Sequence, residues 1–198
     1  NNHLGQKVHP IGFRIGVIRS TDSTWYLPKR GFAEAVLEDY QIRRYVKKNH
    51  YNAAISRVEI ERQGNRIKAT LFTAKPGIII GRQGKGVDEL KAKLEALTKK
   101  QVHVSVQEIR TPDTDAQLVA EAVAQQIEKR IAYKRAMRQA VLRASKLGVK
   151  GIRITCSGRL AGAEMARRES DRLGKIPLQT LRADIGYGFA EAARSEEH

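Results

Sequence analysis

The stretch Pro76-Gly77-Ile78-Ile79-Ile80-Gly81-Arg82-Gln83-Gly84-Lys85 decides how the first half of this chain is interpreted. A short apolar turn stands before a loop with two glycines three residues apart, and an amphipathic pattern begins at Lys85. Two glycines at this spacing are common, and a plain tight turn is the simplest interpretation of the loop alone. Its meaning therefore depends on the elements on either side of it.

Residues 31–48, upstream of the loop, are predicted to form a helix. Apolar side chains recur there at the spacing of one helical face, at Phe32, Val36, Leu37 and Tyr40. Cations crowd the last turns, where they suit the negative end of the helix dipole and where they could also contact RNA. The sequence leaves both interpretations of these cations open.

The segments nearest the loop alternate in the manner of strands. Residues 57–61 and 66–71 are separated by Gln63-Gly64-Asn65, a pattern typical of a β-hairpin. After the loop, an amphipathic helix is predicted from Lys85 and a half-buried strand at 102–106. With the apolar turn counted as a short helix, the order helix-strand-strand-helix-helix-strand resembles the type II KH domain.

That resemblance implies an RNA-binding site in the loop. The KH loop grips the backbone of about four nucleotides. Glycines let the chain approach a phosphate closely, and the following helix presents free N–H groups and its positive dipole end. The expected site comprises Gly81, Arg82, Gln83, Gly84 and Lys85, in which the two cations add charge without reading sequence.

Two nucleotide-binding motifs fail the test of spacing. A P-loop needs glycine five residues before Gly84 and Ser or Thr after Lys85, but Ile79 and Gly86 stand there. The dinucleotide fingerprint fails as well, because Gly81 is not followed by a glycine two residues later. We therefore expect neither a nucleotide nor any other cofactor.

The net charge and the amino-acid composition limit the class of partner that this chain can bind. The 198 residues carry a formal net charge of +16 and a sequence pI near 10.2, which points to a polyanion, with nucleic acid ahead of an anionic membrane. No apolar run approaches the ~20 residues that span a bilayer. A single cysteine, Cys156, excludes an internal disulfide and a thiolate zinc site, and indicates a reducing, intracellular setting.

An enzyme, for example a nuclease, is the least favoured class. The five histidines are scattered along the chain, and no acidic cluster stands in its basic half. Cys156 is interpreted as core packing rather than as a nucleophile. We therefore expect no catalytic residues, no metal site and no small-molecule substrate.

The second half predicts two helices and a sheet. Thr111-Pro112-Asp113 is interpreted as a helix start and as the domain boundary. Apolar faces between 117 and 147 favour two helices with a break near Ala132-Tyr133, closed by Gly148. Buried positions then alternate as in a strand, at Ile152, Ile154 and Cys156.

The predicted fold class is thus α+β with two small domains. Residues 1–30 are an N-terminal arm that gains order from a partner or frays, and residues 31–110 are the type II KH domain. Residues 111–198 are a C-terminal domain of two helices packed on an antiparallel sheet.

Charge is unevenly distributed in the second half. Between 129 and 168 there is one acid, Glu164, against twelve cations. A face that is only soluble would mix signs, whereas this one suits phosphates and carries little sequence information. A solvated basic face with no partner is the alternative. The cations are Lys129, Arg130, Lys134, Arg135, Arg138, Arg143, Lys146, Lys150, Arg153, Arg159, Arg167 and Arg168.

Four ordered motifs carry a closer resemblance. They are the opening 5–10 (GQKVHP), the KH loop, the stretch 157–164 (SGRLAGAE) and the run 177–185 (PLQTLRADI). Together they resemble the family of the third protein of the bacterial small ribosomal subunit, from about Gly5 to Ala192. The basic start, which could be mistaken for a transit peptide, belongs to this family's own beginning.

The resemblance implies a structural place in the head of the small subunit, on a cytoplasmic ribosome or an organellar one. Expected partners are small-subunit ribosomal RNA, neighbouring head proteins and messenger RNA, without a membrane. Lys134, Arg135 and Arg138 match the cluster that faces incoming messenger RNA and helps to open its structure. Further ribosomal RNA contacts are expected at Lys7, His9, Arg14, Arg159, Arg167, Arg168 and Arg182. A free KH-type RNA chaperone or ribosome assembly factor is the alternative.

Four departures from the family pattern stand out. The family usually has glycine at the position of Ala161 and an acid at that of Gly186. Family members also continue into a final strand where this chain ends at 194–198, which indicates either truncation or an unpaired sheet edge. Residues 1–4 lie outside the family pattern.

Overall fold

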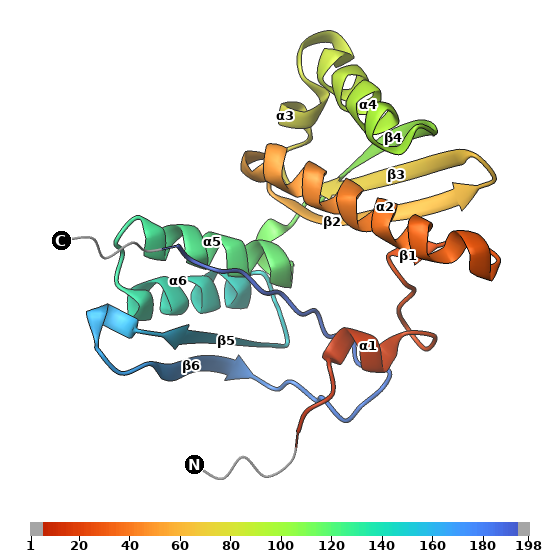
Figure 1. Ribbon diagram of the computed structural model, residues 1–198. Helices are drawn as coiled ribbons and strands as arrows, with labels where there is room; N and C mark the ends of the chain where they lie inside the picture. The colour runs from red at the N-terminus through yellow and green to blue at the C-terminus, as the bar shows by residue number, and fades with distance from the viewer. Residues whose placement is uncertain (1–5, 194–198) are drawn as a thin grey trace. The chain divides into compact units, whose positions relative to one another are not determined.

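The computed structural model describes residues 6–193 (Figure 1). Contacts divide the chain into two compact units, one made of residues 21–110 and one that joins the residues before 21 to those after 110. We call them the KH unit and the split unit. The predicted boundaries at 30 and 110 stay predictions. The predictions for residues 1–5 and 194–198 lie outside the described residues.

The KH unit has a four-stranded sheet in the order β1-β2-β3-β4. β2 and β3 are antiparallel, whereas β1 pairs with β2 and β4 with β3 in parallel. The predicted order of helices and strands is confirmed. In chain order the elements are β1 (Ser23–Thr24), α2 (Lys29–Asn49), η1 (Tyr51–Ala53), β2 (Ile55–Gln63), β3 (Arg66–Thr73), α3 (Pro76–Ile80), η2 (Arg82–Gly84), α4 (Lys85–Thr98) and β4 (Gln101–Glu108).

Aliphatic side chains from every major element of the KH unit form one core. Ile60 on β2 and Leu71 on β3 are fully buried, and Leu94 on α4 and Val102 on β4 pack in the same cluster. Complete burial of one such side chain contributes about 1.5–3 kcal/mol. This cluster fixes the register of the strands, because a slip of one residue would turn these side chains to solvent.

The predicted helix at 31–48 is confirmed as α2, but the apolar face that indicated it is not the buried face. The side chains of Phe32, Val36, Leu37 and Tyr40 are 46–58% exposed. The buried positions of α2 are Ala35, Asp39, Ile42 and Val46. This face is buried because Ile42 and Val46 pack in the core and because the Asp39 carboxylate accepts hydrogen bonds from neighbouring elements.

Those donors form a polar network beside the core. Arg62 on β2 donates to Asp39 and also to Glu38 at 2.6 Å, while Trp25 Nε1 donates to Asp39 at 2.8 Å. Lys100 donates to both oxygens of Glu38 at 2.9 Å. Burial acts to raise the pKa of Glu38, but the hydrogen bonds from Lys100 and Arg62 outweigh it and lower that pKa. Glu38 therefore stays ionised and holds Lys100 in place.

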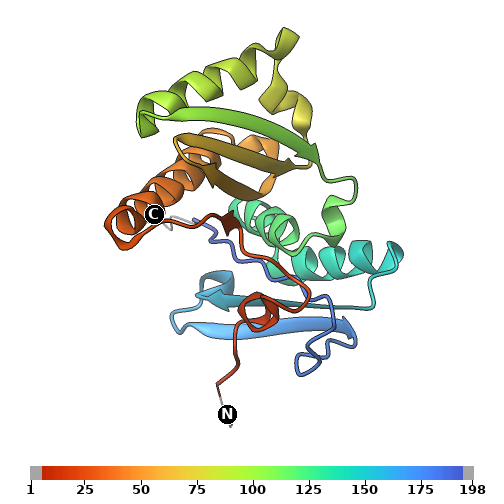
Figure 2. The same ribbon diagram turned by 90° about the vertical axis from the view of Figure 1, so that its right-hand side faces the viewer.

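The split unit packs two helices on a two-stranded antiparallel sheet. In both views α5 and α6 lie on the same side of the sheet of β5 and β6 (Figures 1 and 2; Figure 2 gives the clearer side view). The α+β class and the two helices are confirmed. The elements are α1 (Pro10–Arg14), η3 (Pro112–Thr114), α5 (Ala116–Glu128), α6 (Tyr133–Lys146), β5 (Gly151–Gly158), η4 (Leu160–Gly162) and β6 (Arg167–Gly174).

The predicted helix start at Thr111-Pro112-Asp113 is wrong by one turn. These residues lead into the single 3₁₀ turn η3, and the cap of α5 is Asp115, whose carboxylate accepts from the N–H groups of Gln117 and Leu118 at 3.1 Å. A carboxylate with two backbone donors is the better cap. The predicted break near Ala132-Tyr133 is confirmed.

The β5 face meets the helices as its alternation predicted. Tyr133 and Met137 of α6 cluster with Leu160, and Ile154 and Cys156 of β5 pack against them. Burial, and then the negative charge of Glu169, raise the pKa of the Cys156 thiol. A raised pKa disfavours the thiolate, which fits the interpretation of Cys156 as a packing residue.

Candidate nucleic-acid interface

The KH loop is a sharp exposed turn between α3 and α4. Gly81 (φ 68°), Gln83 (φ 55°) and Gly84 (φ 79°) all have the positive φ that glycine adopts without strain. Gln83 is the one of the three that carries a side chain, and it is exposed at the loop. The structure thus brings the five predicted loop residues together as one protruding segment.

Gly86, the residue that is incompatible with a P-loop, supports this turn. A Cβ there would lie 2.4 Å from the carbonyl oxygen of Ile79, so only glycine lets the first turn of α4 approach α3 this closely. The sequence signal was a glycine inside the start of a helix, where it costs about 1 kcal/mol relative to alanine. Such a residue has a packing reason for its presence.

The start of α4 is arranged as an anion site. Its N-cap, Gly84, has no side chain to accept from the first N–H groups of the helix. Arg82 and Lys85 are exposed beside it, and within residues 6–193 no carboxylate forms an ion pair with either. A helix start without a side-chain cap, a positive dipole end and two cations together suit a phosphate.

The second predicted site, which we call the α6 cluster, is Lys134, Arg135 and Arg138 at the start of α6. All three side chains are exposed, while Tyr133 and Met137 of the same turns are buried. Two of the cations lie in the first helical turn, which contains no acid. Cations at this end oppose the helix dipole at a cost of about 0.3–1 kcal/mol each, so helix stability does not account for them.

The structure joins Arg167 to the α6 cluster. Its guanidinium donates to the Tyr133 hydroxyl at 3.1 Å and lies 3.3 Å from Glu169. The other oxygen of Glu169 is 3.8 Å from Lys134 Nζ. The Tyr133 hydroxyl, followed by the charge of Glu169, raises the pKa of Arg167, so it stays a cation. The cluster thus extends from α6 onto the start of β6.

The other residues predicted to contact ribosomal RNA differ in their exposure to solvent. Arg14 is fully buried and is treated separately below. His9 packs edge-on against the ring of Tyr187, with ring centroids 4.4 Å apart. The exposed ones are Lys7, His9, Arg159, Arg168 and Arg182.

Arg14 is buried inside the split unit, and its hydrogen bonds are made within that unit. Its guanidinium makes five hydrogen bonds, all to backbone carbonyl oxygens, of which Ala183 at 2.7 Å and Thr180 at 2.8 Å are the shortest. With no exposed surface and every nitrogen engaged, it has nothing to offer an RNA phosphate. The arm is therefore held by the chain's own residues 177–183, and Arg14 is excluded from the proposed RNA surface.

Two other kinds of site receive no support from the described residues. In the segment 6–193, no three His, Cys, Asp or Glu side chains gather in a group that could hold a metal ion. Within the same segment, no helix combines the length and the apolar character needed to cross a membrane.

Comparisons with known proteins agree with this geometry. A KH domain model matches residues 41–114, and a model described as Ribosomal protein S3, C-terminal domain, matches residues 123–196. The chain is 57% identical over 190 residues to small ribosomal subunit protein uS3 of Clostridium botulinum (strain Loch Maree), which covers 96% of this chain and 85% of the relative. It is 56% identical over 189 residues to the uS3 proteins of Desulforamulus reducens and Carboxydothermus hydrogenoformans, with 96% of this chain covered and 86% and 85% of those proteins.

Proposed function

Because the chain belongs to the uS3 family of small ribosomal subunit proteins, we propose that it binds small-subunit ribosomal RNA through its KH loop and guides messenger RNA with its α6 cluster. It is a structural protein of the cytoplasmic bacterial ribosome and not an enzyme. The observation that carries the proposal is the pair of exposed cationic sites, each built on the start of a helix.

The KH loop supplies the first part. An uncapped helix start beside Arg82 and Lys85 holds phosphates by backbone N–H groups and charge, without reading bases. Ribosomal RNA then supplies the polyanion that the net charge of +16 requires. Neighbouring proteins of the subunit head are the further expected partners.

The test of the loop is the double change Arg82→Asp/Gln83→Asp. Aspartate tolerates the positive φ of residue 83, so the fold should remain while affinity for small-subunit ribosomal RNA falls. Lys91→Asp/Ala92→Asp is the matched control, because it changes the charge equally at exposed positions of α4. Equal affinities of the two variants at matched salt would remove the loop from the proposal.

The α6 cluster supplies the second part. Two of its cations lie in the first turn, where they weaken the helix, and the cations outnumber Glu169, the carboxylate paired with Lys134 and Arg167. Such a surface attracts the backbone of a single strand and disfavours its return to a duplex, through charge alone and without ATP. Messenger RNA that enters the small subunit is the strand we assign to it.

The test of the cluster is Lys134→Ala/Arg135→Ala/Arg138→Ala in ribosomes that translate matched structured and unstructured messages. We expect the structured message to be slowed more. Arg143→Ala/Lys146→Ala/Lys150→Ala removes the same charge further along the chain and should not discriminate between messages. Equal slowing of both messages by the cluster variant would contradict the role.

A sucrose gradient distinguishes a resident protein from a free RNA chaperone or assembly factor. The proposal expects the tagged chain to migrate with small subunits and whole ribosomes at moderate salt, together with small-subunit ribosomal RNA. A peak confined to light or precursor fractions, with varied RNAs, would favour the free factor.

A further inference from the structure

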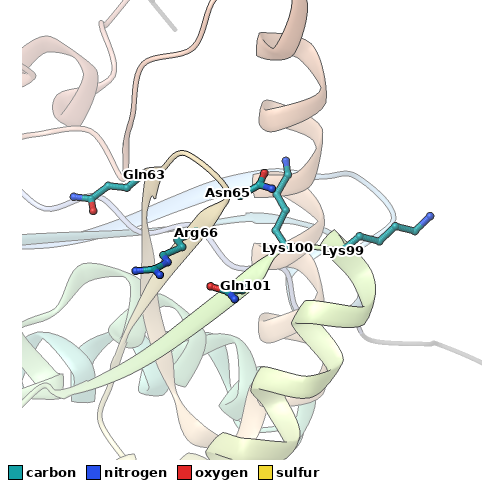
Figure 3. Close-up of a pocket in the computed structure, with 6 residues that line it drawn as sticks. All are labelled: Gln63, Asn65, Arg66, Lys99, Lys100 and Gln101. Atoms are coloured by element: carbon teal, nitrogen blue, oxygen red, sulfur yellow. The ribbon is translucent and has the colours of Figure 1, made fainter.

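A hollow of about 520 Å³ opens in the KH unit between two turns, the one that joins β2 to β3 and the one that joins α4 to β4. Figure 3 shows the six side chains that line it, which are Gln63, Asn65, Arg66, Lys99, Lys100 and Gln101. Neither the KH loop nor the α6 cluster contributes to it.

The hollow lies at the opposite end of β3 from the KH loop. Arg66 begins the strand and Thr73 ends it, and the loop follows only after α3. Seven steps along a strand span roughly 23 Å. A ligand in the hollow is therefore a different group from the phosphates beside Arg82.

The charge of the hollow is positive and only partly neutralised. Three of its six lining residues are cations and none is an acid. Lys100 is held by Glu38, at 2.9 Å from both oxygens. Arg66 and Lys99 are exposed, and among the described residues neither has a carboxylate within ion-pair distance.

Helix stability explains only one of these two cations. Lys99 is the C-cap of α4, where a cation suits the helix dipole, and its side chain extends outward in Figure 3. Arg66 begins a strand and has no such reason to be charged. Its backbone pairs with Gln101 in the β3–β4 register, and in Figure 3 its guanidinium extends to the side away from Lys99.

The backbone fixes both rims of the hollow. Gly64 has φ 58° in the hairpin turn, and Lys99 has φ 55° where α4 ends. Gln63 pairs with Arg66, which in turn pairs with Gln101, so these three are spaced by the sheet itself. Amide groups beside a guanidinium offer hydrogen bonds to ribose hydroxyls as well as charge for a phosphate.

We propose that this hollow binds a phosphate of the RNA backbone and is a second RNA contact of the KH unit, remote from the KH loop. The guanidinium of Arg66 holds the phosphate oxygens, Lys99 adds positive charge at the outer rim, and the amides contact the adjoining ribose. The inference rests on the proposed binding of ribosomal RNA. An acidic segment of a neighbouring protein is the competing occupant, and the test separates the two.

The experiment measures binding of the full chain to deproteinised small-subunit ribosomal RNA across a series of KCl concentrations. The variant is Arg66→Gln/Lys99→Asn, because asparagine tolerates the positive φ of residue 99. Arg57→Gln/Lys68→Gln is the control, since it removes the same charge from the same sheet at residues already paired with Glu59 and Glu61. Thermal melts establish that all variants fold.

We expect the hollow variant to bind about tenfold more weakly near 0.15 M KCl, with a log–log salt slope shallower by about 0.7–0.9, as for one lost phosphate contact. The control should keep the wild-type slope. Affinity and slope equal to wild type would overturn the proposal, and failure to join small subunits despite normal RNA binding would assign the hollow to an acidic protein instead. If Arg82→Asp/Gln83→Asp still weakens binding in the same series, the KH loop stands whatever the hollow does.

Discussion

The two units of this protein differ in the interactions that stabilise each of them internally. In the KH unit, thirteen buried aliphatic residues form one continuous cluster shared by helices and sheet. In the described part of the split unit, the corresponding cluster joins only Tyr133, Met137 and Leu160, and other buried side chains, such as Val123 and Val141, lie outside it. A unit whose buried side chains form no single large cluster gains more of its order from directed polar contacts.

Two buried arginines make the contrast concrete. Arg62 in the KH unit is paired with the carboxylates of Glu38 and Asp39 beside an existing core. Arg14 in the split unit contacts no carboxylate among the described residues, and its five carbonyl partners come from segments far apart in the sequence. Arg62 therefore neutralises charge within a core already formed, whereas Arg14 ties together segments that the core does not reach.

The largest expected effect is that of Arg62→Ala, which would break the ionic arrangement of the KH unit. The change leaves Asp39, whose side chain is 3% exposed, without its charge partner, so we expect a loss of about 3–5 kcal/mol. Urea unfolding followed by Trp25, the single tryptophan, reports on this unit. Lys68→Ala, which breaks an exposed pair with Glu61, should cost under about 1 kcal/mol. If the two variants lost similar stability, the ion network would not be what distinguishes the KH unit.

Arg14→Gln should have a smaller but more widespread effect in the split unit. We expect a loss of about 2–3 kcal/mol, because several carbonyls lose their donor but remain neutral and accessible to water. Faster amide hydrogen exchange in residues 177–184 is the specific readout. Arg14→Lys tests whether charge suffices, because an ammonium cannot reach five separated carbonyls. Normal exchange in Arg14→Lys would contradict the proposed geometric role of the guanidinium.

Low pH should weaken the ion pairs of Glu38 in the KH unit but not the hydrogen bonds of Arg14 in the split unit. The pKa of Glu38 is lowered in the folded state below its ordinary value of 4.5, so its stabilising contribution is present above pH 4.5 and is lost as pH falls through the lowered folded value. The stability difference between wild type and Glu38→Gln should therefore shrink below pH 4.5. The deficit of Arg14→Gln should stay constant over the same range, because carbonyl groups do not titrate. A Glu38 difference that persists in acid would mean that its charge is not what matters.

The sequence predicted what depends on local pattern and missed what depends on distant partners. The order of elements in the KH unit, the glycine loop and the break before Tyr133 all follow from spacing and turn chemistry, and all are confirmed. The buried face of α2 could not be found this way, because Asp39 is buried only by donors from other elements. Arg14 was expected on the RNA surface for its charge, and nothing local reveals carbonyls that lie more than 160 residues away.

The smallest effect concerns Ala161, where the family resemblance leads one to expect glycine. Its φ of 57° and ψ of 29° lie in the left-handed region, which costs an alanine about 1–2 kcal/mol. Ala161→Gly should relieve this strain at an exposed site and stabilise the split unit by about 0.5–1 kcal/mol, after the greater freedom of glycine in the unfolded chain is subtracted. Ala163→Gly, at φ −64° and ψ 141°, relieves nothing and should destabilise by a similar amount. The melting temperatures of both variants are measured in an Arg14→Gln background, where the difference between them would be larger. Equal changes in melting temperature for the two glycine variants would show that the left-handed turn carries no strain.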